Sequence, residues 1–231
     1  MVRFAEEPLH SARRMGGSHP GENRMAVAEY AQPYPVQVSL DPPVEPRNKM
    51  TVGFRIILAI PHALLVGGLA YAGVSFSFWN SFGGFFNTGV LGAVAGVCAV
   101  ICWFAILFAN QHPQGLKDLI MFYLRWRTRA VAYMALFRDE YPPFGDEAYP
   151  ASIEVTIAEG ERDKTSIALR FIYAIPHILA MIVLGIAWTV TSIIAWFAIL
   201  INGTYPEGLY NFGVGVYRWG LRVEAYVLLL V

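Results

Sequence analysis

Two histidines are the residues best suited to carry chemistry in this chain. His62 and His177 each end an Arg-x5-Pro-His motif, which begins at Arg55 in the first copy and at Arg170 in the second. A proline within a helix frees the carbonyl four residues earlier, and a neighbouring imidazole can satisfy such a backbone group. The structural interpretation is that both histidines do this near a membrane boundary. The functional alternative is that the two imidazoles meet as ligands of a transition metal or of the two faces of haem.

A second candidate site consists of arginines beside tryptophans in two matching segments. The first holds Arg125, Trp126 and Arg129, and the second holds Arg218, Trp219 and Arg222. Arginines one helical turn apart beside tryptophan are typical of charges that reach lipid headgroups above an aromatic belt. The functional alternative is a specific pocket for phosphate or anionic lipid between the two copies.

Arg55 and Arg170 belong to the same candidate lipid-binding or partner-binding set. An arginine at the middle of a bilayer is unfavourable by several kcal/mol, so we expect both at the cytoplasmic headgroup level. There they anchor a span, hold a lipid phosphate, or pair with Asp118 or Glu224. The sequence does not choose among these roles.

No motif in the sequence predicts an enzyme. Gly-x-Ser-x-Gly, His-Glu-x-x-His, a phosphate loop and a dinucleotide fingerprint are all missing. The long apolar segments contain no Asp or Glu, which a transporter of small solutes is expected to use, so transport is only a third interpretation. Cys98 and Cys102 lie inside an apolar segment, where they are expected to pack rather than bind metal.

The composition predicts a membrane protein. Hydrophobic residues make up 56% of the 231 residues, charged residues only 15%, and the mean hydropathy is +0.45. These values are too apolar for an ordinary soluble domain of this length. The formal net charge is zero, and no exposed basic segment is interleaved with stacking aromatics, so nucleic acid is not an expected partner.

The chain contains an internal repeat, and each copy is expected to begin with a strand. Trp103-Phe104-Ala105-Ile106-Leu107 recurs unchanged at residues 196–200, which supports a duplication. Residues 36–40 alternate apolar and polar, as residues 153–157 do in the second copy, which predicts two short strands. We expect these strands to pair, and to rest on the helices because two strands alone are marginal.

The apolar segments predict spans of different kinds in the two copies. Residues 54–74 and 88–108 are each long enough for a ~30 Å hydrocarbon core. Between them, the uncharged insertion at about 75–87 is expected to be an interfacial turn. Residues 167–201 form one apolar run in the second copy, for which we favour a helical hairpin turning near 185–192. One long bent span and a re-entrant pair are the alternatives.

The basic residues flanking these segments predict orientation. By the positive-inside rule the N-terminus and the Arg-rich segments are cytoplasmic. Each apolar unit is then followed by an amphipathic interfacial helix, the first over 117–137, with Arg127 alone on its apolar side. The fold class is therefore a mainly α membrane protein with two tandem repeats. Each repeat has a short N-terminal strand, a transmembrane helical hairpin and an amphipathic helix.

The expected organisation has three parts. Residues 1–33 form a disordered tail without the apolar core of a secretory signal. Met1, Met15 and Met25 are alternative translation starts. Residues 34–144 form membrane repeat 1, and residues 145–231 form membrane repeat 2.

Several motifs together resemble the bacterial family of domains of unknown function numbered 4389. These motifs include the two Ala-Ile-Pro-His segments, the two Trp-Phe-Ala-Ile-Leu segments, Tyr205-Pro206-x-Gly208-Leu209, and residues 139–144, Asp-Glu-Tyr-Pro-Pro-Phe. The resemblance extends from about Tyr34 to the end. It implies a multi-pass bacterial membrane protein with duplicated modules and no established activity or cofactor. The chain departs from the pattern in its uncharged insertion and in ending at Val231, where a second Asp-Glu-Tyr-Pro-Pro-Phe-like tether is expected.

The sequence therefore predicts a non-catalytic protein of the bacterial inner membrane. We expect a scaffold or accessory subunit that binds anionic lipid or a larger membrane complex through its cytoplasmic Arg and aromatic face. Its expected partners are membrane lipids and a protein partner or a second copy of the chain, with no cofactor. The alternative is a redox or metal-binding protein that uses His62 and His177.

Overall fold

The computed structural model describes residues 34–43, 45–67, 89–145, 147–156 and 163–231. The predicted tail at 1–33 and the uncharged insertion at about 75–87 lie outside the described residues. In chain order, the elements are β1 (Val36–Leu40), α2 (Lys49–Gly53), α3 (Arg55–Val66), α5 (Gly89–Ala109), α6 (Gln114–Met134), β2 (Ala151–Val155), α7 (Lys164–Ala168), α8 (Arg170–Asn202) and α9 (Glu207–Val227).

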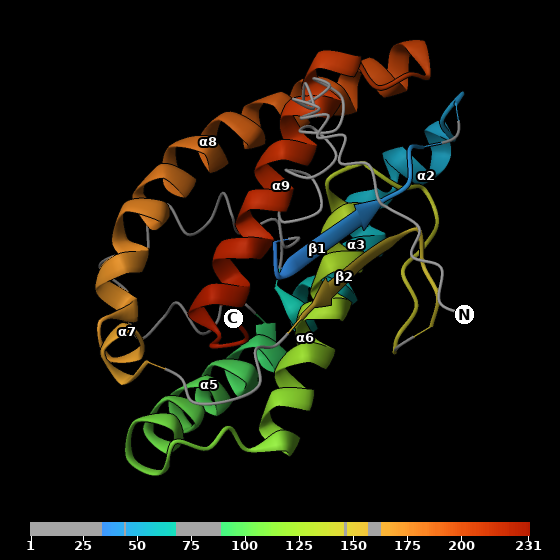
Figure 1. Cartoon of the computed structure of the whole chain (residues 1–231). Helices are drawn as coiled ribbons and strands as arrows, with labels where there is room; N and C mark the ends of the chain where they lie inside the picture. Colours follow the sequence, from blue (N-terminus) through green and yellow to red (C-terminus); the bar gives the residue numbers. More distant parts are fainter. Residues whose placement is uncertain (1–33, 44, 68–88, 146, 157–162) are drawn as a thin grey trace, which may run out of the picture. The chain divides into compact units, whose positions relative to one another are not determined.

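The two predicted strands are present and pair with each other. β1 has the predicted bounds, whereas β2 lies two residues earlier than expected because Ala151 pairs with Leu40 at its start. The pairing is antiparallel, and the two strands lie side by side in Figure 1. Ala151 and Ile153 are buried, because alternate side chains of β2 point to one face. The sheet packs against α6 and α9, as expected for so small a sheet.

α8 corrects the prediction for the second apolar run. The hairpin turning near 185–192 is wrong, because residues 170–202 form a single helix that curves along its length (Figure 1). Gly185 is buried in this helix. The hydroxyls of Thr189 and Thr191 donate to the carbonyls of Gly185 and Trp188, so these polar groups are hydrogen-bonded within the helix. At 1.5 Å per residue the helix is about 50 Å long, more than a ~30 Å hydrocarbon core requires.

The first copy agrees with the prediction where the structure describes it. α5 covers the predicted span at 88–108, shifted by one residue. α3 covers the beginning of the predicted span at 54–74 and ends at Val66, followed by Gly67 with φ 81°. The rest of that predicted span lies outside the described residues.

The second half of α6 is buried in the protein core, whereas its first turns are largely exposed. The polar arc of the predicted helix included Thr128 and Arg129, yet both side chains are buried. The Thr128 hydroxyl donates to the Leu124 carbonyl, and Arg129 Nη1 donates to the Glu147 carbonyl at 2.7 Å. Thr128 and Arg129 are therefore covered by protein, because their donors find backbone acceptors, whereas Asp118 and Arg125 remain exposed.

The two copies of the Trp-Phe-Ala-Ile-Leu motif make reciprocal hydrogen bonds. Trp103 in α5 donates to the carbonyl of Ile167 in α7, and Trp196 in α8 donates to the carbonyl of Val52 in α2, each at 3.0 Å. Val52 and Ile167 each lie three residues before the arginine that starts the Pro-His motif. Each half of the chain thus fixes a short helix of the other half.

Replacing either tryptophan should therefore weaken the contact between the halves to a similar degree. We expect Trp103→Phe and Trp196→Phe each to lower the free energy of unfolding by about 0.5–1.5 kcal/mol through the lost hydrogen bond. Denaturant titration in detergent, followed by far-ultraviolet circular dichroism, would measure this. A matched Trp219→Phe control, on a half-exposed side chain, should change little. A change in only one of the two variants would contradict equivalent roles.

Candidate functional site

Arg55 caps the end of α6 instead of facing lipid. Its Nη1 donates to the carbonyls of Tyr133 and Arg138 at 2.9 and 3.0 Å, and its guanidinium lies 4.5 Å from the centre of the Tyr133 ring. Carbonyls at a helix C-terminus lack partners within the helix and carry partial negative charge, so a cation there is stabilising. The other donor of Arg55, Nη2, binds Asp139 Oδ1 at 2.6 Å.

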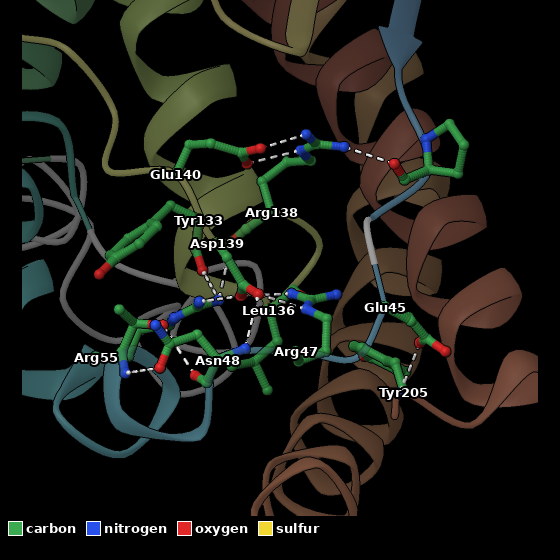
Figure 2. Close-up of polar contacts among 12 residues, drawn as sticks. Glu45, Arg47, Asn48, Arg55, Tyr133, Leu136, Arg138, Asp139, Glu140 and Tyr205 are labelled. Atoms are coloured by element: carbon green, nitrogen blue, oxygen red, sulfur yellow. Dashed lines mark hydrogen bonds and ion pairs between the residues drawn. The ribbon is translucent and has the colours of Figure 1, made fainter. Parts of the chain in front are cut away.

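Asp139 joins Arg47, which precedes α2, to Arg55, the first residue of α3. Arg47 donates from Nε to Oδ2 at 2.8 Å and from Nη2 to Oδ1 at 2.9 Å, which is a bidentate pair, and Arg55 binds the same carboxylate (Figure 2). Arg47 also donates to the carbonyl of Leu136 at 2.6 Å. Burial raises the pKa of the Asp139 carboxyl, but the bonds and charges of the two arginines outweigh it and hold the pKa below its usual value.

Arg138 extends this group to the strand. It forms two hydrogen bonds with Glu140, at 2.9 and 2.5 Å, and donates to the carbonyls of Asp41 and Pro42 just after β1 (Figure 2). The Arg138 contact outweighs burial and lowers the pKa of Glu140. We call Arg47, Arg55, Arg138, Asp139 and Glu140 the Asp139 cluster. It connects β1, α3 and the end of α6.

Arg170 occupies the equivalent position in the second half. Its Nη1 donates to the carbonyl of Tyr226 near the end of α9 at 2.9 Å, and its guanidinium lies 4.4 Å from the centre of that ring. Both helices end in the same way, because Leu136 and Leu229 adopt positive φ values of 66° and 64°. We expected Arg55 and Arg170 to pair with Asp118 or Glu224. For Arg55 this prediction is wrong, because Arg55 binds Asp139. For Arg170 the structure shows Tyr226.

Glu224 pairs instead with Arg127, the arginine on the apolar side of the predicted helix. Arg127 Nε donates to Glu224 Oε2 at 2.9 Å, and Nη1 donates to the carbonyl of Val66 at the end of α3 at 2.7 Å. Tyr123 donates to the other oxygen of Glu224 at 2.9 Å. Arg127 is 3% exposed as a side chain and Glu224 15%. This buried pair connects α3, α6 and α9.

The two candidate histidines lie in different surroundings. His62 is fully buried; its Nδ1 accepts a hydrogen bond from Trp126 at 3.1 Å, and its ring stacks on Phe144 with centres 4.5 Å apart. His177 is exposed on α8, with its ring 6.4 Å from that of Trp219. No hydrogen bond or ring contact within the described part of the chain joins the two imidazoles.

The remaining candidate arginines differ in exposure. Arg125 is exposed and lies with Arg129 beside a groove of about 410 Å³ that also includes Glu147 and Glu154. Arg218 is exposed on α9 and its neighbour Trp219 is 38% exposed, whereas Arg222 is half-buried. Of the candidate set, Arg125, Arg218 and Trp219 therefore face outward.

Sequence reasoning missed Arg47, Arg138 and Asp139 as parts of one group. The one available signal was the Asp-Glu-Tyr-Pro-Pro-Phe motif, in which an acidic pair is followed by prolines. Arg127 also carried a signal, because an arginine on an apolar helix face requires a buried partner. Among the residues that the structure describes, no three His, Cys, Asp or Glu side chains are grouped as a metal would require.

These features define a mainly helical protein with a small two-stranded sheet and two helices, α5 and α8, long and apolar enough to cross a membrane. The chain belongs to the family described as domain of unknown function DUF4389, whose sequence model matches residues 83–145 and 164–231. Two matched segments are consistent with a duplicated domain. No curated protein and no solved structure gives a significant match.

Proposed function

We propose that this protein is a non-catalytic bacterial inner-membrane protein, a scaffold or accessory subunit that binds anionic lipid through outward-facing arginine and tryptophan side chains. The observation that carries the proposal is the exposure of the apolar helices. In their most apolar stretches only 33% of α5 and 22% of α8 is buried within the protein. The core helix of a soluble protein would be mostly buried, whereas a helix that is apolar all round and uncovered is suited to lipid.

The charged groups support the same proposal. Six arginines are buried with carbonyl or carboxylate partners, so they stabilise the fold and do not reach lipid headgroups at the surface: Arg47, Arg55, Arg127, Arg129, Arg138 and Arg170. Arg218 and Trp219 on α9 face outward beside His177 of the apolar helix α8. A cation and a tryptophan next to an apolar surface are the side chains expected at lipid headgroups.

Flotation with lipid vesicles tests the membrane assignment. We expect the full chain, reconstituted from detergent, to float with phosphatidylglycerol vesicles and to resist extraction by alkaline carbonate. A chain that remains soluble without detergent and does not float with these vesicles would contradict the proposal. Lipids and proteins that co-purify in mild detergent, identified by mass spectrometry, would show whether a protein partner accompanies the lipid.

Arg218 tests the headgroup contact. Since a basic side chain at an anionic membrane surface contributes about 1 kcal/mol, Arg218→Gln should weaken phosphatidylglycerol binding roughly fivefold. Arg218→Lys is the matched control, because it keeps the charge and should bind within about twofold of the parent. Titration of the detergent-solubilised protein with short-chain phosphatidylglycerol and phosphatidylcholine would measure both. Equal affinities for the two lipids would argue against an anionic headgroup site.

A further inference from the structure

A pocket between α3 and α8 has the features of a binding site for one hydrocarbon chain. Its volume is about 470 Å³, within the ~300–1,000 Å³ typical of small-molecule sites. Its walls come from α3, the end of α6 and α8, and they are apolar except for Arg55, Thr189, Ser192 and the indole of Trp196. The hydroxyl of Thr189 is already bound to a helix carbonyl, and the Trp196 N–H to Val52.

The pocket lies on the apolar outer surface of the protein. Three side chains that line it are also more than half exposed: Ile56, Ile193 and Phe197. Two of them belong to α8, one of the two helices apolar enough to cross a membrane. In a bilayer this surface contacts lipid hydrocarbon and not water, so a molecule that enters here is itself apolar along most of its length.

One wall of the pocket carries an unused donor. Arg55 is 3% exposed, and its Nε has no hydrogen-bond partner among the described residues. Asp139 is shared by Arg47 and Arg55, so one carboxylate faces two guanidinium groups. A buried N–H without an acceptor is unfavourable. An anionic oxygen in the pocket would complement both the donor and the charge.

We propose that this pocket binds a long-chain fatty acid, with its acyl chain between α3 and α8 and its carboxylate towards Arg55 and Ser192. This inference rests on the proposed location in the membrane, and it adds a defined ligand to it. A fatty acid fits better than a phospholipid, because the pocket is a single apolar space and the free carboxylate places the negative charge at the end of one chain.

Trp196 provides a direct readout, since it lines the pocket and bromine quenches tryptophan fluorescence on contact. Stearic acid brominated at mid-chain is titrated into the full chain in detergent. The part of the quenching lost in Trp196→Phe is assigned to the pocket, and we expect it to saturate. Ser192→Phe, which fills the pocket, should weaken this saturable binding at least tenfold. Val190→Phe is the control on the same helix, because Val190 is 53% exposed and does not line the pocket.

Circular dichroism and a melting curve in the same detergent establish that each variant is folded. The proposal would be overturned by quenching that does not saturate, by equal quenching in Ser192→Phe and the parent, or by quenching with brominated phosphatidylcholine alone. A pocket covered by a second copy of the chain or by another of its segments would give no quenching, which also contradicts the proposal. Vesicle flotation separates the membrane assignment from the fatty-acid site. A chain that floats with vesicles but binds no fatty acid would refute only the fatty-acid site.

Discussion

Asp139→Asn is expected to lower the free energy of unfolding by about 2–4 kcal/mol, because it leaves two buried arginines without their shared counter-charge. Arg47 and Arg55 have side chains 0% and 3% exposed, whereas the Asp139 side chain is 25% exposed. Solvent at the carboxylate therefore places the effect below that of a fully buried pair. Thermal and denaturant unfolding of the purified protein in detergent would measure the change.

Glu140→Gln is the matched control for this variant. The Glu140 carboxylate also pairs with an arginine, but the Glu140 side chain is 50% exposed. The free energy of unfolding should therefore fall by less than about 1 kcal/mol. An equal effect of the two variants would show that Asp139 has no special role in joining α3 to the end of α6.

The same pair of carboxylates predicts how stability depends on pH. Their pKa values are lower in the folded chain than their ordinary values. The folded state therefore binds fewer protons than the unfolded state, and the contribution to stability is fully present above the ordinary carboxylate pKa values. It is lost as the pH falls through the lowered values. Unfolding curves from pH 7 to pH 3 should show this loss, and Asp139→Asn should make the curve shallower.

Glu224→Gln should lower the free energy of unfolding by about 3–5 kcal/mol, similar to or more than Asp139→Asn, because Arg127 is almost completely buried and would lose the charged carboxylate that it binds at 2.9 Å. The carboxylate also accepts a bond from Tyr123, so the change affects two partners from α6. We expect α9 to separate from α6 before the rest of the protein unfolds. Hydrogen exchange of the α9 amides would detect this.

A double variant separates the missing partner from the buried charge. Glu224→Leu leaves the buried charge of Arg127 without the Glu224 carboxylate, whereas Glu224→Leu combined with Arg127→Met removes both charges and keeps apolar volume. We expect the double variant to be more stable than Glu224→Leu alone. Glu207→Gln at the exposed start of α9 is the neutral control. A double variant less stable than the single one would show that the bond from Arg127 to Val66 dominates.

Local patterns in the sequence predicted much of the fold. The alternation at 36–40 gave the bounds of β1, and the apolar run at 88–108 gave α5 to within one residue. The repeated motifs also predicted paired strands, which the antiparallel register between β1 and β2 confirms. These features depend on the residues of one segment and on its period, so neighbouring residues suffice to predict them.

Local patterns did not predict the single helix formed by residues 170–202. The basic residues that flank the apolar run, together with its length, favoured two short helices. The structure has one helix, α8, in which Trp188 stacks on Phe137 with 6.0 Å between the ring centres. Phe137 follows α6 and lies far away in the sequence. A pattern within the apolar run contains no information about that contact.

Sequence alone determined the apolar class of the chain, its repeated motifs and its strands. The tertiary structure alone decided which arginines stabilise the fold. Arg55 binds residues 78–84 positions away and Arg127 binds a carboxylate 97 positions away. A buried guanidinium must find acceptors where the packed helices place them. Whether an arginine binds lipid or the chain itself therefore depends on packing and not on residue spacing.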